Sequence, residues 1–137
     1  RMMKAIKPFF YVTDVGFILY WLVTGLGLIP AAWAFNGYHD PVLVAWNWSF
    51  LPLDLLVSAT GLTALWAERT GRLDWRGLAI ASLAFTSASG LNAVAFWALR
   101  GEFDWQWWLP NLYLLLYPWW FLPKLMSAFP LRRDVQP

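Results

Sequence analysis

The sequence contains no cysteine and only one histidine in 137 residues. The absence of cysteine excludes disulfide bonds, thiolate metal sites and dithiol redox chemistry. The single histidine, His39, lies next to Asp40 in a short polar break, and one imidazole without clustered carboxylates is a poor metal site. No nucleophile–base triad or phosphate-binding loop is visible in the sequence either. We therefore expect no metal and no cofactor.

Charged side chains are also scarce, at 13% of the residues against 60% hydrophobic residues. This balance is far from that of an ordinary soluble domain. The net charge of +2 is spread over short polar breaks, without the basic and aromatic interleaving of a nucleic-acid surface. The expected partner is the lipid bilayer, and we expect no nucleic-acid partner.

The apolar residues form four blocks, each long enough for the roughly 20 residues that a helix needs to cross a bilayer. The blocks cover about residues 8–35, 42–66, 78–99 and 109–129. The first block is too long for the core of a signal peptide, so we interpret it as a retained helix. The four blocks leave no room for a soluble domain. They predict an all-α integral membrane protein, a four-transmembrane-helix bundle forming one domain over 1–137.

Basic residues alternate between the two sides of this arrangement. The breaks after the first and third blocks contain only Arg100, whereas both ends of the chain and the central break are rich in Lys and Arg. The positive-inside rule therefore predicts that the N and C termini and the central break lie in the cytoplasm. The basic residues on that side are Lys4, Lys7, Arg69, Arg72, Arg76, Arg132 and Arg133. The many tryptophans near the opposite boundary are typical of an aromatic belt.

Each block also carries a stripe of side chains spaced by three, four or seven residues, which share one face of a helix. Lipid cannot satisfy hydrogen-bonding groups, so we expect the stripes to face one another inside the bundle. Packing through small residues and hydroxyls explains many of them. The stripes are Asp14, Phe17, Trp21 and Thr24; Asn47, Asp54, Ser58 and Gly61; Ser82, Thr86, Ser89 and Asn92; and Tyr113, Tyr117, Trp120 and Lys124.

Asp14 and Lys124 lie at similar depths in the first and fourth blocks. Each is about 7–8 Å to the cytoplasmic side of its block's midpoint, at 1.5 Å of rise per residue. A charge at depth is costly unless it has a partner. We therefore predict a structural ion pair between Asp14 and Lys124 that joins the first and last helices. Snorkelling of Lys124 to the membrane surface is the alternative.

Asp54 lies near the centre of the second block, in the stretch "AWNWSFLPLDLL", and has no cation at its own depth. We expect Ser89, Asn92 and Tyr117 as its neighbours. Burial among neutral groups favours the protonated acid, which can act as a donor. Pro52 loosens the same helix because it lacks an N–H group. An acid inside a membrane is a functional-site hypothesis by default, with a structural role as the alternative.

A few polar groups among aromatic rings are typical of a ligand pocket. We therefore predict that a hydrophobic or isoprenoid-like small molecule binds around Asp54. The expected binding residues are Trp21, Asn47, Phe50, Asp54, Ser89, Asn92, Tyr113, Tyr117 and Trp120. The alternatives are a membrane isomerase or cyclase with protonated Asp54 as general acid, a proton-coupled small-molecule transporter, and an accessory subunit of a membrane complex. The sequence decides neither among these nor on the oligomeric state.

Several stretches resemble a known family. The segments "KPFFYVTDVGFILYW", "AWNWSFLPLDLLVSATGL", "SGLNAVAFWALRGEFDWQWWLPNLYLLLYP" and "PKLM" are similar to the YvaD family of small bacterial membrane proteins. The resemblance implies four spans and a location in the bacterial cytoplasmic (inner) membrane, and it implies no activity. The placement of Asp14 and Asp54 on the first two spans also resembles that in sterol isomerases and sigma-two-type receptors, by architecture alone.

Overall fold

The computed structural model describes residues 2–26 and 40–127, and every regular element among them is a helix. The elements are α1 (Met2–Phe10), the π-helical η1 (Tyr11–Val15), α2 (Gly16–Gly25), α3 (Pro41–Thr70), α4 (Trp75–Leu99) and α5 (Trp105–Ser127). The predicted all-helical fold is confirmed. His39, Arg132, Arg133 and the predicted end of the first block near Phe35 lie outside the described residues.

Three helical segments are long and apolar enough to cross a membrane, which indicates a membrane protein. They are Met3–Gly25, which joins α1, η1 and α2, then Pro41–Thr70 (α3) and Trp75–Leu99 (α4). Among the described residues α5 is not a further such segment, although it has 23 residues. Its sequence mixes leucines with tryptophan, tyrosine and three prolines, and these residues lower its mean hydropathy.

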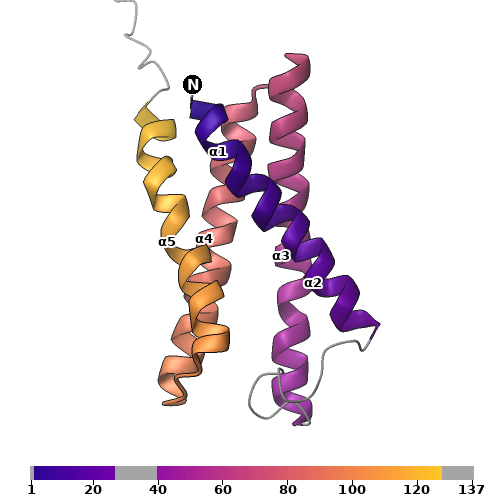
Figure 1. Ribbon diagram of the computed structural model, residues 1–137, viewed down its shortest axis with the longest axis vertical. Helices are drawn as coiled ribbons and strands as arrows, with labels where there is room; N and C mark the ends of the chain where they lie inside the picture. Colours follow the sequence, from indigo (N-terminus) through magenta and orange to yellow (C-terminus); the bar gives the residue numbers. More distant parts are fainter. Residues whose placement is uncertain (1, 27–39, 128–137) are drawn as a thin grey trace, which may run out of the picture.

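The helices run as rods along the long axis of the molecule, apart from the first (Figure 1). α3, α4 and α5 follow one another up and down, joined by short turns, and the rod formed by α1, η1 and α2 crosses them obliquely. This rod begins close to the end of α5 and finishes beyond α3. The N-terminal residues, the α3–α4 turn and the end of α5 therefore share one end of the molecule.

Local capping chemistry explains where the later helices begin. The side chain of Asp40 accepts a hydrogen bond from the backbone N–H of Val42 (2.9 Å). Asp74 accepts one from the N–H of Arg76, and Asp104 accepts one from the N–H of Gln106 (3.0 Å each). An aspartate at this position satisfies backbone donors that the first helical turn leaves unpaired. Gly71 ends α3 with a positive φ of 67°, a conformation that costs glycine little. The three aspartates are therefore structural caps.

α4 and α5 pack closely against each other. A Cβ atom at Gly90 would lie 2.5 Å from the backbone oxygen of Asn111 and 2.6 Å from the backbone nitrogen of Leu115, so only glycine fits there. Ser87 donates to the backbone oxygen of Leu115 (3.0 Å) and accepts from the indole N–H of Trp119 (2.9 Å). Small residues and interhelical hydrogen bonds are what holds helices together in lipid.

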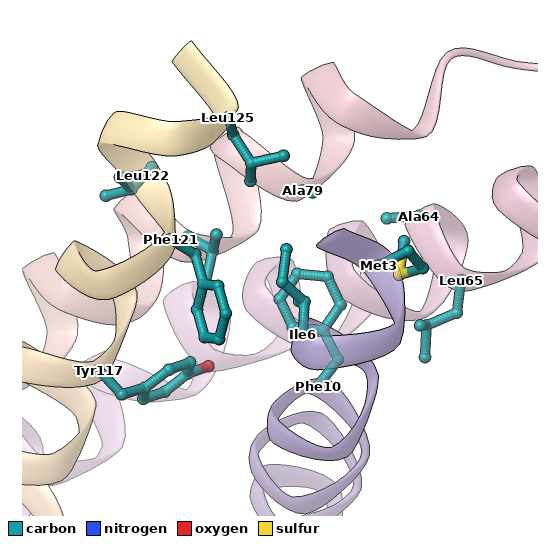
Figure 2. Packing of buried hydrophobic residues seen from close by; sticks show 11 residues of the cluster. Met3, Ile6, Phe10, Ala64, Leu65, Ala79, Tyr117, Phe121, Leu122 and Leu125 are labelled. Carbon is teal, nitrogen blue, oxygen red and sulfur yellow. The ribbon is translucent and has the colours of Figure 1, made fainter. Parts of the chain in front are cut away.

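One end of the molecule is tightly closed by a hydrophobic cluster, which we call the closed end (Figure 2). Side chains from α1, α3, α4 and α5 meet there, and Ile6, Phe10, Leu83 and Leu125 have no exposed surface. The cluster comprises Met3, Ile6, Phe10, Ala64, Leu65, Ala79, Leu83, Tyr117, Phe121, Leu122 and Leu125. It fixes the start of the first rod against the other three helices.

Candidate functional site

At the opposite half of the molecule the helices surround a cavity of about 300 Å³. We call this half the hollow end. η1 and α2 line the cavity on one side, α5 on another, and α3 and α4 between them. The lining residues are Val12, Thr13, Gly16, Phe17, Tyr20, Trp21, Trp46, Asn47, Phe50, Asp54, Ser89, Ala93, Trp97, Trp107, Pro110, Asn111, Tyr113 and Leu114. Most of the wall is therefore apolar or aromatic.

Asp54 contributes the carboxyl group of this wall and is only 4% exposed. Its Oδ2 accepts a hydrogen bond from the indole N–H of Trp21 on α2 (2.9 Å). Its Oδ1 accepts one from the hydroxyl of Ser89 on α4 (3.0 Å). Because the donors come from two different helices, the carboxyl group joins α2, α3 and α4 and has a defined orientation.

The position of Trp21 depends on neighbouring rings. Its ring packs at 5.1 Å from that of Trp48 and at 5.0 Å from that of Tyr20, between ring centroids. Trp21 also belongs to a small buried cluster with Phe50 from α3 and Ala93 from α4. The side chain that donates to Asp54 is therefore held by packing as well as by its hydrogen bond.

A second group of rings forms the far wall of the cavity. Trp46 stacks on Phe96 with ring centroids 3.9 Å apart and 16° between the planes, and Trp97 meets Trp46 edge to face at 5.5 Å. Trp97 is only 6% exposed. Trp46, Trp97 and Trp107, three of the tryptophans near the predicted outer boundary, all line the cavity. Their spacing places them on inward helix faces, which the count of tryptophans alone does not reveal.

Two pairs of polar side chains lie near the rings. The Tyr20 hydroxyl donates to the side-chain oxygen of Asn47 over 3.4 Å, and the hydroxyls of Thr13 and Tyr113 lie 3.1 Å apart. These four residues all line the cavity. They give it hydrogen-bonding groups on the sides of η1, α2, α3 and α5, in addition to the carboxyl of Asp54.

Six of the nine predicted binding residues line the cavity: Trp21, Asn47, Phe50, Asp54, Ser89 and Tyr113. The predicted contact between Asp54 and Ser89 is confirmed. Asn92 and Trp120 instead lie on exposed faces, and Tyr117 is buried in the closed end. On α4 the residue that follows Ser89 on the inward face is Ala93, four residues on, and on α5 Phe121 follows Tyr117 in the same way. The prediction had taken a step of three at both places.

The predicted ion pair between Asp14 and Lys124 is not formed. Among the residues that the structure describes, the ion pair is Arg100–Glu102 (3.3 Å), at the α4–α5 turn. The Lys124 ammonium lies over the ring of Trp120, 4.5 Å from its centroid, on the exposed face of α5. Asp14 is completely buried. The two side chains point apart because Leu125, not Lys124, continues the inward face of α5.

Several lining residues were missed by the sequence analysis. Ala93 follows Ser89 by four residues on the inward face, a signal that was available. Pro110 and Asn111 lie near the start of α5, and Gly16 begins α2. No pattern in the sequence reports that the first rod crosses the bundle obliquely, so the residues that it brings opposite α5 were not predictable.

The arrangement of the cavity residues suits an organic small molecule better than a metal ion. No group of three or more His, Cys, Asp or Glu side chains lies within metal-binding distance in the parts of the chain that the structure describes. The polar groups of the cavity are the oriented carboxyl of Asp54, the amides of Asn47 and Asn111, and several hydroxyls, and the rest of the wall is apolar or aromatic. Aromatic faces and a carboxylate both attract cationic groups, while the rings also accept apolar chains.

Comparisons with known proteins agree with the sequence resemblance. Residues 6–131 match the model of a family described as "Family of unknown function (DUF5360)". The chain is 52% identical over 125 residues to "Uncharacterized protein YvaD" of Bacillus subtilis (strain 168), a match that covers 91% of this chain and 94% of that protein. No solved structure matches the chain. The chain therefore belongs to the YvaD family, a family of unknown function.

Proposed function

We propose that this protein is an integral membrane protein that binds a hydrophobic small molecule in the cavity around Asp54. The observation that carries the proposal is a buried, oriented carboxyl group in the wall of an otherwise aromatic and apolar cavity. Ligand pockets have this make-up, with a few placed polar groups in a mainly apolar lining. The cavity volume of about 300 Å³ is at the lower end of the usual range.

In the proposed membrane topology, α5 is a fourth transmembrane span and both termini lie in the cytoplasm. Lys4, Lys7, Arg69, Arg72 and Arg76 lie towards the end that also holds the α3–α4 turn. Arg100 lies at the opposite end, where it is paired with Glu102. This distribution supports a cytoplasmic closed end and an outward hollow end. The bacterial source of the similar protein, together with the long apolar helices, supports a location in the bacterial cytoplasmic (inner) membrane.

A ligand would enter from the bilayer, between α2 and α5. α2 packs against α3 and η1, whereas α5 packs against α4, and both helices contribute residues to the cavity wall. Val12, in η1 next to α2, is 67% exposed although it also lines the cavity. A side opening within the apolar zone suits a molecule that is already dissolved in lipid.

Asp54 selects the polar end of the ligand. Its carboxyl accepts hydrogen bonds from Trp21 and Ser89 and leaves further lone pairs for a donor in the cavity. An ammonium or hydroxyl group on an isoprenoid-like chain fits this arrangement. The same two hydrogen bonds favour a binding role over that of a general acid, because an acid catalyst must direct its own proton at the substrate.

Binding of a matched pair of probes tests this function. Farnesylamine and farnesol share one isoprenoid chain and differ in their polar ends. In nanodiscs, with empty nanodiscs as the baseline, we expect both to change the tryptophan fluorescence of the protein. Asp54→Asn should weaken farnesylamine binding by about tenfold, because a hydrogen bond to a charged group contributes about 1.5 kcal/mol. Farnesol should be affected less.

A pair of asparagine variants supplies the control. Asn47→Ala removes a polar group from the cavity wall and should weaken binding, whereas Asn92→Ala changes an exposed residue and should not. Equal affinities of the wild type, Asp54→Asn and Asn47→Ala for both probes would contradict the proposed function.

A further inference from the structure

A second buried carboxyl group, that of Asp14, lies outside the cavity lining. Asp14 is in η1 and has no exposed surface. Neither of its carboxyl oxygens has a hydrogen-bond partner among the residues that the structure describes. It faces α3 at Gly61, two helical turns from Asp54 towards the closed end, which is about 10 Å along the helix at 1.5 Å per residue.

Gly61 provides the space for this carboxyl group. A Cβ atom built on Gly61 would overlap Oδ2 of Asp14, and the same point lies 2.9 Å from the hydroxyl oxygen of Ser82 on α4. The carboxyl group therefore occupies the place of a missing side chain, between α3 and α4. The first rod, α3 and α4 surround the carboxyl group, so neighbouring atoms define its position.

The nearby hydroxyl groups do not donate to it. Ser58 donates to the backbone oxygen of Asp14 (2.8 Å), and Ser82 donates to the backbone oxygen of Val57 (3.0 Å). Thr86, one turn from Ser82, donates to the backbone oxygen of Ser82 (2.7 Å). Each hydroxyl carries one proton and has used it, so these groups offer only lone pairs to Asp14.

The titratable and charged groups around Asp14 come from few elements. α5 contributes Tyr117, whose buried hydroxyl interacts electrostatically with Asp14 and lies beside the hydroxyls of Thr13 and Thr86. Figure 2 shows this ring reaching from α5 towards the first rod. α3 contributes Asp54, two turns away, and α4 contributes hydroxyls alone. Within the described part of the chain no cation lies within ion-pair distance of Asp14.

We propose that Asp14 is a proton-binding site, at which the carboxyl group carries an exchangeable proton in the folded protein. A buried carboxylate surrounded by acceptors and without a cation is strongly disfavoured, whereas a protonated carboxyl can donate to a lone pair of Ser82 or Tyr117. The proton comes from water and leaves to water when the protein opens. The site is separate from the ligand cavity, so it does not depend on the proposed function.

Infrared spectroscopy of the protein in nanodiscs tests the site directly. The carbonyl stretching band of a protonated carboxylic acid should be present in the wild type at neutral pH and lost or clearly reduced in Asp14→Asn. Asp54→Asn serves as the matched control, because it removes the other buried acid and should leave the Asp14 band. If Asp14→Asn removes only carboxylate bands, the proposal is wrong.

Stability gives an independent readout. The folded wild type holds a proton that the unfolded chain releases at neutral pH, so its thermal midpoint should fall as the pH rises. Asp14→Asn, whose amide also supplies donors, should remove this part of the pH dependence. A wild-type midpoint that rises with sodium chloride but not with choline chloride, together with a missing acid band, would assign the site to Na⁺ and overturn the proton site.

A further variant keeps Asp14 itself in place. Ser82→Ala removes one hydroxyl acceptor beside the carboxyl group, so the acid band should shift towards the frequency of a more weakly hydrogen-bonded acid. This result is expected even if Asp14→Asn does not fold. An acid band that is absent from both the wild type and Ser82→Ala would also overturn the proposal.

Discussion

The two ends of this molecule use the same four helical rods in different ways. At the closed end, side chains from α1, α3, α4 and α5 interlock, and six of them have no exposed surface. At the hollow end, aromatic side chains of comparable size surround a cavity of about 300 Å³ instead of filling it. The difference shows that large apolar side chains do not by themselves close a bundle, because the helix axes must also converge.

Convergence is lost at the hollow end because of the first rod. α1 lies close to α5, whereas α2 leaves towards α3 (Figure 1). The buried clusters follow this geometry, since the cluster at the closed end joins four helices and the one around Trp21 joins α2, α3 and α4 only. Rigidity is therefore expected at one end and adaptability at the other.

The comparison predicts the largest effect for a phenylalanine at the closed end. Phe10→Ala should lower the free energy of unfolding by about 3 kcal/mol, because the void cannot collapse among fully packed neighbours. Phe17→Ala, at the cavity, should cost about 1 kcal/mol or less, since its ring already borders empty space. Unfolding of both variants in detergent, followed by far-UV circular dichroism, measures the two values. Equal costs would remove the distinction between the ends.

A smaller effect is expected where the hollow end is held together by a hydrogen bond. Trp21→Phe keeps most of the ring but removes the indole N–H that donates to Asp54, so it should cost about 1–2 kcal/mol. Trp48→Phe is the control, because Trp48 packs on Trp21 and is 38% exposed. The same unfolding experiment applies. A Trp21→Phe variant as stable as Trp48→Phe would mean that the hydrogen bond does not hold α2 to α3.

The smallest change in stability is expected when the cavity is filled. Ala93→Leu adds methyl groups at the cavity wall and should change the free energy of unfolding by less than about 1 kcal/mol, because space is available. Ala79→Leu, in the closed end, should cost about 2–3 kcal/mol, because Ala79 is fully enclosed. Ala93→Leu should also abolish farnesylamine binding in nanodiscs. Unchanged binding would place the ligand elsewhere.

Helix positions were largely predictable from apolar content. The predicted second block, 42–66, lies within α3 (Pro41–Thr70), and the third, 78–99, lies within α4 (Trp75–Leu99). The helices extend beyond the blocks because their polar ends are stabilised by the capping residues Asp40 and Asp74 and by Gly71. Hydropathy reports the apolar part of a helix, whereas capping decides its ends.

The candidate site was predictable in part, because helical spacing defines a face only to within one step of three or four residues. Asp54 and Ser89 were correctly placed in contact, but Asn92 and Trp120 were placed inward on steps of three. The hydrogen bond from Trp21 to Asp54 was missed because it depends on how the oblique first rod aligns with α3. The π-helical turn at 11–15 carries no sequence signal that we can identify.

The oblique first rod has a mechanical consequence. It is clamped near Phe10 and reaches the cavity at Trp21, eleven residues further along, which is about 16 Å of helix. A pivot of about 5° at the clamp would carry Trp21 sideways by about 1.5 Å over that lever arm. A small rotation at the closed end is thus magnified into a change of cavity width. The part of the first rod that reaches the cavity, α2, would move while α3, α4 and α5 stay in place.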